Sequence, residues 1–500
     1  MEPCSVASIM SLGSLAIQRT NLCSLIFRAL PRLLGFTPSS LKKFCKDVHP
    51  RLTETMVGTL PELPQDILMG IFATLEIPDL IRAGAVCPSW HSAYTSLRSL
   101  GIYKLPQTPC LLYTSEFASD NSAYIYSLGE KKSYKITLPK PAICTRYLIG
   151  SSHGWLVTVD ERSEMHLVNP ITCEQIALPS VITIEQVKPI FDEYGVLQKY
   201  EFSWHTGMHD GFNSPSIFAL DKLREELHFK AFVFDDTSTV SYIVVLIHNP
   251  MRQLSFARVG ADKWTWLPPY DIYDDCTYKN DILYAVTGTG EIHAFDLSGP
   301  VVTMKMIMGT SEFISAGSMY IVQDPWGDLL LIRRIFEEYD LEPDHGAPVF
   351  WKTGSINMYE VDVVASKLKE INLLSDLVLF LGHNQSVCLS AKEYPALKAN
   401  HVYFTDDSFL WTTGLKNNHR DMVILNLDDN SKEELVPSQL CSNFPAPIWI
   451  TPGLKKMNVS GGLKKKFDGS NKPTKGWFAR FLWLLEEVIN KIPKGPLECV

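Results

Sequence analysis

The spacing of apolar residues changes along the chain, and the first distinct pattern is helical. Between residues 60 and 98 apolar positions recur at helical spacing, which predicts a helix with one buried face. Pro64 suits the first turn of this helix, and Asp66 favours the positive end of its dipole. The apolar positions on this face are Ile67, Leu68, Ile71, Phe72 and Leu75.

Two more helices are predicted in the same stretch. Pro78-Asp79 ends the first helix and begins a second, and Cys87-Pro88-Ser89 separates the second from a third. The apolar positions in these two helices are Leu80, Ile81, Val86, Trp90, Tyr94 and Leu97. Three short helices bury little surface by themselves, so this unit is expected to need a partner or a neighbouring domain.

From about residue 105 to 452 the pattern changes to that of β-strands. Short β-branched and aromatic runs recur between Gly, Pro, Asn and Asp turns. Many runs are apolar on consecutive residues, as expected of strands that are covered on both faces. Repeated strand groups of this kind predict a β-propeller of six to seven blades. The groups lie at about 108–140, 145–178, 230–267, 274–306, 318–374 and 377–436.

Two further segments bear on this propeller. The stretch 181–229 is interpreted as either a long insert or a degenerate blade. The run Ile448-Trp449-Ile450 is expected to pair with the first blade and so close the ring, which removes an open sheet edge. The predicted fold is mainly β, a propeller preceded by a small three-helix domain.

The two ends of the chain form separate regions. Residues 1–46 contain one acid and six basic residues, which suits either an organellar transit peptide or an unstructured extension. A helix predicted near the other end places Phe478, Phe481, Leu485 and Val488 on one face. That face could bind a membrane surface, dock a partner helix or pack on the propeller itself. The predicted organisation is a basic extension at 1–58, a helical domain at 59–100, a propeller at 105–452, a basic linker at 453–475 and an amphipathic helix at 476–492.

The net charge of −9 is unevenly distributed along the chain. Residues 1–46 carry +5, residues 455–480 carry +7 and residues 481–500 carry −1, so the remaining 47–454 hold −20. The strong negative charge of the predicted helical domain and propeller argues against nucleic acid as a partner, because phosphate binding needs a basic surface. It favours a partner with a basic surface. No apolar run is long enough to span a membrane.

The candidate chemical motifs are weak. Gly150-Ser151-Ser152-His153-Gly154 has the spacing of a nucleophile elbow, but a strand follows it where that motif needs a helix. We therefore expect a hairpin turn, with an esterase using Ser152 as a remote alternative. Gly288-Thr289-Gly290 is likewise expected to be a turn. The acidic pairs 235–236, 274–275 and 406–407 are expected to cap turns.

The cysteines and histidines give no sign of a metal site. The eleven cysteines are scattered and never in C-x-x-C spacing, which favours reduced thiols over zinc binding or a disulfide framework. The thirteen histidines show no ligand spacing. No catalytic residue, cofactor or metal is expected, and the chain is predicted not to be an enzyme.

The helical region resembles an F-box: a Leu-Pro pair, a paired apolar helix face, an Asp-Leu pair and then Val-Cys-x-x-Trp. His91 and Gly84-Ala85 depart from that pattern. The resemblance implies that the helices dock into a groove of the Skp-type adaptor of a cullin–RING ubiquitin ligase. A helical unit that only packs on the propeller is the alternative. The implied docking residues are Leu63, Pro64, Ile67, Leu68, Ile71, Phe72, Leu75, Leu80, Val86 and Trp90.

The β region resembles the kelch-like, KIB-type propellers of plant F-box proteins. The resemblance rests on His153-Gly154-Trp155-Leu156, Asn169-Pro170-Ile171-Thr172, Lys263-Trp264-Thr265, Tyr403-Phe404-Thr405-Asp406-Asp407 and Ile448-Trp449-Ile450-Thr451-Pro452. It implies a plant substrate-recognition adaptor of an SCF-type ligase, acting in the cytoplasm and/or nucleus through its propeller on an unknown protein target. The alternative is a structural or organellar binding protein with a vestigial F-box.

Overall fold

The computed structural model describes residues 63–115, 122–206, 214–236, 241–267, 272–299, 301–309, 317–339, 350–407, 421–435, 444–455 and 457. The described residues divide mainly into a helical unit up to Gln107 and a β unit over Thr108–Gly453. The predicted extension at 1–58, the amphipathic helix at 476–492 and most of the basic linker at 453–475 lie outside the described residues.

The described part of the helical unit consists of three short helices, as predicted. They are α3 (Gln65–Phe72), α4 (Ile77–Gly84) and α5 (Pro88–Ser99). Proline stands in the first turn of both α4 and α5, where its missing N–H costs no hydrogen bond. Helices α3 and α4 both pack against α5.

The β unit is built from small antiparallel sheets, and the mainly β prediction is confirmed. The first two sheets contain, in spatial order, β28 (Ile448–Ile450), β1 (Cys110–Tyr113), β2 (Ser122–Ser127) and β3 (Lys132–Thr137), and then β4 (Tyr147–Ser152), β5 (Trp155–Val159), β6 (Met165–Val168) and β7 (Gln175–Ala177). The third and fourth contain β11 (His228–Asp236), β12 (Ser241–His248), β13 (Gln253–Arg258) and β14 (Thr265–Trp266), and then β15 (Tyr273–Lys279), β16 (Ile282–Thr287), β17 (Ile292–Asp296) and β18 (Thr303–Met308).

The last two blades follow the same plan, with one departure. The fifth contains β19 (Gly317–Gln323), β20 (Leu329–Tyr339), β21 (Phe350–Asp362) and β22 (Lys367–Ile371). The sixth has five strands, β24 (Val387–Ser390), β23 (Leu377–Leu381), β25 (His401–Phe404), β26 (Val423–Asn426) and β27 (Lys432–Glu434). Strands β23 and β25 run parallel, which departs from the otherwise antiparallel pattern.

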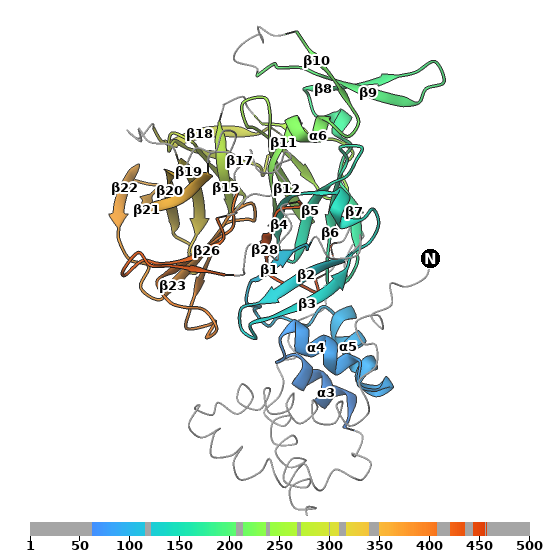
Figure 1. The fold of residues 1–500 in the computed structure, drawn as a ribbon, viewed down its shortest axis with the longest axis vertical. Coiled ribbons are helices and arrows are strands. Elements are labelled where there is room, and N and C mark those ends of the chain that lie inside the picture. The colour runs from blue at the N-terminus through green and yellow to red at the C-terminus, as the bar shows by residue number, and fades with distance from the viewer. Residues whose placement is uncertain are drawn as a thin grey trace, which may run out of the picture. The chain divides into compact units, whose positions relative to one another are not determined.

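These six sheets form a closed ring of blades (Figure 1). An apolar cluster lies between each blade and the next, including one that joins the sixth blade to the first through Phe380 and Trp449. Strand β28 pairs with β1, with Trp449 opposite Leu111, so the predicted closure of the ring is confirmed. Burial on both strand faces explains the continuous apolar runs: all five residues of β5 and of β23 are buried.

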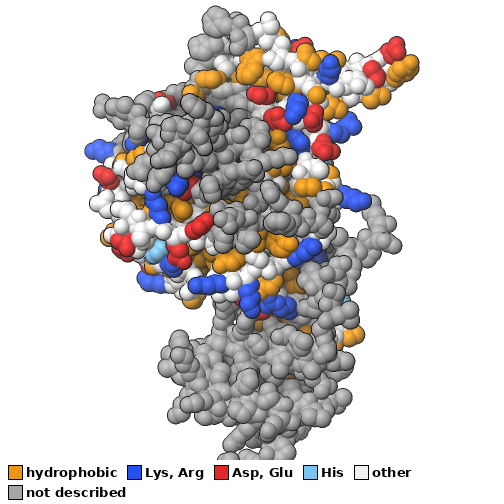
Figure 2. Space-filling view, in the orientation of Figure 1, with side chains coloured by type: hydrophobic (Ala, Val, Ile, Leu, Met, Phe, Trp, Pro, Cys, Tyr) orange, Lys and Arg blue, Asp and Glu red, His pale blue; other side chains and the backbone are white. Residues whose placement is uncertain are grey.

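The stretch 181–229 is an insert between the second and third blades. It forms the sheet β10 (Ser216–Ala219), β9 (Leu197–Phe202) and β8 (Val187–Phe191), followed by helix α6 (Leu223–Leu227). Tyr200 and Phe202 anchor one face of this sheet in the apolar cluster between the two blades. At the free end of the β8–β9 hairpin Tyr194 is 82% exposed, and Figure 2 shows hydrophobic and acidic side chains together there.

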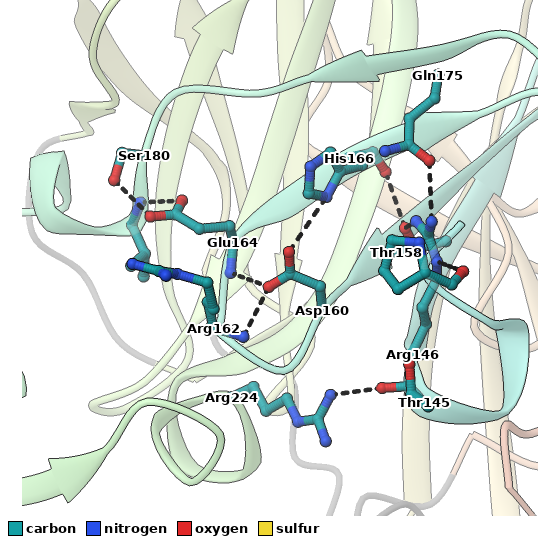
Figure 3. A network of polar contacts seen from close by, with 12 residues as sticks. Thr145, Arg146, Thr158, Asp160, Arg162, Glu164, His166, Gln175, Ser180 and Arg224 are labelled. Atoms are coloured by element: carbon teal, nitrogen blue, oxygen red, sulfur yellow. Dashed lines mark hydrogen bonds and ion pairs between the residues drawn. The ribbon is translucent and has the colours of Figure 1, made fainter. Parts of the chain in front are cut away.

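A polar network fixes both ends of this insert to the second blade (Figure 3). Glu164 accepts hydrogen bonds from Ser180 Oγ at 2.6 Å and from the Val181 N–H at 3.0 Å, where the insert begins. Arg224 of α6 donates to the Thr145 carbonyl at 2.7 Å. The next residue, Arg146, is buried. Its hydrogen bonds to described residues all go to neutral oxygens, those of backbone carbonyls, Thr158 and Gln175, and burial lowers the pKa of its guanidinium. Both ends of the insert are therefore fixed to the second blade.

Candidate functional site

The predicted docking residues of the helical unit separate into a buried and a partly exposed group. Six of them are at most 9% exposed: Ile67, Leu68, Ile71, Phe72, Leu75 and Leu80. Pro64 is exposed, and Leu63, Val86 and Trp90 are partly exposed. Only this second group offers side-chain surface to a partner without rearrangement of the helices.

The two groups meet at one aromatic contact. The Trp90 ring packs edge-on against Phe72 with the ring centroids 5.2 Å apart. Phe72 is 1% exposed, whereas Trp90 keeps part of its surface accessible. The helix interior therefore holds in place an aromatic side chain that a partner can reach.

The two departures from the F-box pattern have a common structural reason at the crossing of α4 and α5. A Cβ atom on Gly84 would lie 2.8 Å from Cγ of Tyr94, so a larger residue would push the helices apart. His91 lies within hydrogen-bonding distance of the Gly84 carbonyl, at 3.2 Å from Nδ1. The small residue thus permits close packing of the two helices.

In the β unit a cavity of about 500 Å³ lies where the inner strands of the ring meet. Each of the six blades contributes lining residues from its innermost strand, and Figure 1 shows β4 and β28 near the centre of the ring. One such residue from each blade is Ser152, Phe234, Thr277, Gln323, Val387 and Trp449. A site made by all blades is fixed by the whole ring, which favours precise recognition.

The structure places the Gly150 to Gly154 motif at the cavity wall in a strand–turn–strand context, and the predicted hairpin turn is confirmed. Ser152 Oγ donates to the Val233 carbonyl at 2.5 Å, and Ser151 Oγ donates to the Trp449 carbonyl. A Cβ atom on Gly150 would lie 1.9 Å from the Ala231 carbonyl oxygen. The motif serves the close approach of neighbouring blades, and this geometry does not support Ser152 as a nucleophile.

The turn expected at Gly288-Thr289-Gly290 is also confirmed. It joins β16 to β17, and the Gly290 N–H donates to the Thr287 carbonyl at 3.0 Å.

The expectation that the acidic pairs cap turns is wrong for three of their members. Asp274 and Asp275 lie inside β15 and accept hydrogen bonds from the N–H groups of Met319 and Ile321 on the next blade. Asp407 lies 3.1 Å from the guanidinium of Arg334. These carboxylates join neighbouring blades.

Buried cations complete the connections between blades, and the sequence analysis missed them. Lys230 Nζ lies 3.0 Å from Asp275 Oδ1, and Arg334 lies 2.9 Å from Asp421. Burial raises the pKa of Asp407, but Arg334 and Lys230 outweigh that effect and leave this pKa below its usual value. A basic residue within an apolar strand run, as in His228-Phe229-Lys230-Ala231-Phe232, was the available signal.

Two negative findings hold for the part of the chain that the structure describes. Over these ranges no cluster of three or more His, Cys, Asp or Glu side chains is arranged to hold a metal ion. None of the helices within them has the length and apolar character needed to cross a membrane.

The fold defines a class: a three-helix unit in one chain with a β-propeller. Residues 125–426 match the family described as KIB1-4 beta-propeller, and residues 60–99 match the F-box-like family. The chain therefore belongs to the KIB1-4 beta-propeller family, as a plant F-box protein with a propeller domain.

Two relatives from Arabidopsis thaliana agree with this assignment. F-box only protein 7 of Arabidopsis thaliana is 25% identical over 71% of this chain and 85% of its own length. The probable F-box protein At4g22165 of Arabidopsis thaliana is 22% identical over 79% of this chain and 97% of its own. The solved Cps50 (Swd1) beta-propeller domain of Myceliophteria thermophila gives a TM-score of 0.25 at 8% identity, over 50% of this chain and 79% of that chain.

Proposed function

We propose that the protein is the substrate-recognition adaptor of an SCF-type, cullin–RING E3 ubiquitin ligase. The helical unit binds the Skp-type adaptor, and through it the cullin, while the propeller binds a protein target. The chain catalyses nothing itself; it brings target and ligase together, so that ubiquitin transfer becomes a tethered reaction. The proposed place of action is the cytoplasm and/or the nucleus.

The partly exposed group of the helical unit carries this proposal. Pro64, Val86 and Trp90 provide apolar surface on an otherwise well-packed helical unit. Exposed apolar and aromatic side chains that are held by packing are typical anchors of protein interfaces. Buried positions such as Ile67 and Leu68 support that surface from within.

The test is direct binding of the purified full-length chain to a Skp-type adaptor. Val86→Asp and Trp90→Ala should each weaken binding at least tenfold, because both remove contact surface at the interface. Leu100→Asp is the matched control, since Leu100 is 64% exposed at the end of α5 but lies outside the predicted docking set. Thermal unfolding would show that each variant still folds.

The proposal fails if the parent chain does not bind the adaptor, or if the Val86 and Trp90 variants bind as well as the parent. No adaptor binding by a folded parent chain would favour the alternative, a structural or organellar binding protein with a vestigial F-box.

A further inference from the structure

This inference rests on the proposed function and concerns how the propeller recognises its target. The cavity at the centre of the ring is large enough for a long side chain and is walled by aromatic rings and neutral polar groups. Among the aromatic lining residues, Tyr278 and Tyr394 keep part of their surface accessible, whereas Phe234, Phe380 and Trp449 are at most 3% exposed. Aromatic faces attract cations, most strongly where water is excluded.

The charge at the cavity favours a cation. Among the described lining residues Asp235 is the one carboxylate; it is 43% exposed and lies 3.8 Å from His153. His153 opposes that charge fully only when it is protonated. An anion would meet repulsion here.

Two polar atoms at the cavity wall are not satisfied by the fold. Asn384 and Trp449 are each 2% exposed, and Asn384 Oδ1 and Trp449 Nε1 have no hydrogen-bond partner among the described residues. A buried polar atom without a partner is destabilising. Because each of these two atoms has almost no accessible surface, neither is a contact point for the ligand.

An exposed tryptophan lies near the cavity on a turn whose backbone is fixed. Trp326 is 69% exposed at the tip of the β19–β20 turn. Asp324 Oδ1 accepts hydrogen bonds from the N–H groups of Trp326, Gly327 and Asp328 at 2.7 to 2.9 Å, which fixes this turn. Gln323, which lines the cavity, donates to the Gly327 carbonyl at 3.3 Å. An exposed tryptophan on a fixed turn is a typical interface anchor.

We propose that this cavity receives a lysine or arginine side chain from an extended segment of the target protein. The cationic group pairs with Asp235 and contacts the accessible tyrosines of the cavity lining, and the peptide on either side packs on Trp326. The ligand class is a basic peptide segment.

The experiment measures the binding of four blocked, fluorescently labelled peptides to the full-length chain, at about pH 7.5 and physiological salt. The first three alternate glycine with lysine, acetyl-lysine or glutamate, and the fourth has the sequence of residues 462–475 of this chain. The lysine peptide should bind, while acetyl-lysine and glutamate peptides should bind at least tenfold more weakly.

Variants separate the cavity from the general acidity of the propeller. Asp235→Asn should weaken binding of the lysine peptide about tenfold, and Trp326→Ala several-fold. Asp262→Asn, which removes an exposed carboxylate outside the cavity lining, is the matched control and should bind as the parent does.

Equal affinity of the Asp235 and Asp262 variants, or equal binding of lysine and acetyl-lysine peptides, would overturn the proposal. So would tighter binding of the 462–475 peptide than of the lysine peptide, because the occupant would then be the chain's own basic segment. Binding to the Skp-type adaptor should be unchanged in Asp235→Asn, so failure here is distinguishable from failure of the proposed function.

Discussion

Lys230 Nζ lies 3.0 Å from Asp275 Oδ1 between the third and fourth blades, and neither side chain is more than 2% exposed. Asp275 also accepts hydrogen bonds from Ser386 Oγ at 2.6 Å and from the Ile321 N–H at 3.1 Å. One carboxylate thus connects strands β11, β15 and β19 with the segment that precedes β24. Because the pair is buried, removing one partner leaves an uncompensated charge in the interior.

We therefore expect Lys230→Met to lower the free energy of unfolding by about 3 to 5 kcal/mol. Urea or thermal unfolding followed by circular dichroism measures the change. Lys369→Met is the control, because Lys369 lies 2.8 Å from Glu360 in a pair whose side chains are 74% and 48% exposed. Breaking that surface pair should cost at most about 1 kcal/mol. Equal losses in the two variants would contradict the assigned role of Lys230.

The glycine at the start of the Gly150 to Gly154 motif gives a second prediction. Gly150→Ala places a methyl group 1.9 Å from the Ala231 carbonyl oxygen, where backbone must shift. Overpacking of this kind costs typically about 1 to 3 kcal/mol, so the unfolding midpoint should fall. Gly309→Ala is the control, since nothing lies within 4 Å of the added atom. The packing role of Gly150 is refuted if both variants unfold at the parent's midpoint.

The sequence predicted the elements of this fold well, because each depends on local spacing. Helical spacing of apolar residues predicted α3. Short apolar runs separated by turn residues predicted the six strand groups. The pairing of the 448–450 strand with the first blade was predictable too, because an unclosed ring leaves sheet edges unpaired.

The sites were less predictable, because they depend on contacts between distant residues. Ser386 lies 111 positions from the Asp275 carboxylate to which it donates, and no local pattern signals that contact. An amphipathic stripe also does not reveal which of its members a fold buries: Ile67 is interior and Val86 is partly exposed. The sequence therefore predicted a group of candidate docking residues but not which of them are exposed.

Thiol reactivity gives a third prediction. Cys144 is exposed, whereas Cys276 and Cys388 are buried. Burial raises the pKa of both buried thiols, that of Cys388 to about 12, so neither forms the reactive thiolate near neutral pH. Brief alkylation at about pH 8 followed by peptide mass spectrometry should modify Cys144 well before the other two. After denaturation all three should react alike. Early modification of Cys388 in the folded chain would contradict the structure.

The last prediction concerns pH and two buried histidines that face each other across neighbouring strands. His228 in β11 is directly opposite His248 in β12, and both are at most 3% exposed. Burial lowers the pKa of His228 from 6.5 to about 3, helped by the neighbouring His248, and burial lowers that of His248 to about 4. Both rings are therefore neutral in the folded protein near neutral pH.

Protonation of these rings in the unfolded chain should make stability depend on pH. Between about pH 4 and 6.5 the unfolded chain binds protons that the folded chain does not, so the free energy of unfolding falls as pH falls through this window. The ion-paired Asp407 and Asp421 have a lowered pKa, so they lose their contribution only at lower pH. Unfolding midpoints should be nearly constant from about pH 7 to 8 and decrease steadily from about pH 6.5 to 5.

A variant isolates the contribution of the histidine pair. Burial raises the pKa of Glu164, and a raised carboxyl pKa makes the free energy of unfolding rise as pH falls, opposite to the effect of the histidines. Each variant is therefore compared with the parent at every pH. His248→Gln keeps an amide that can replace the hydrogen bond to Ser255 Oγ, 2.9 Å from Nε2, but it cannot bind a proton in this range. It should flatten the decrease below pH 6.5, whereas His401→Gln, at a partly exposed position, should leave it unchanged. A parent-like slope in the His248 variant would show that the buried pair does not cause the acid sensitivity.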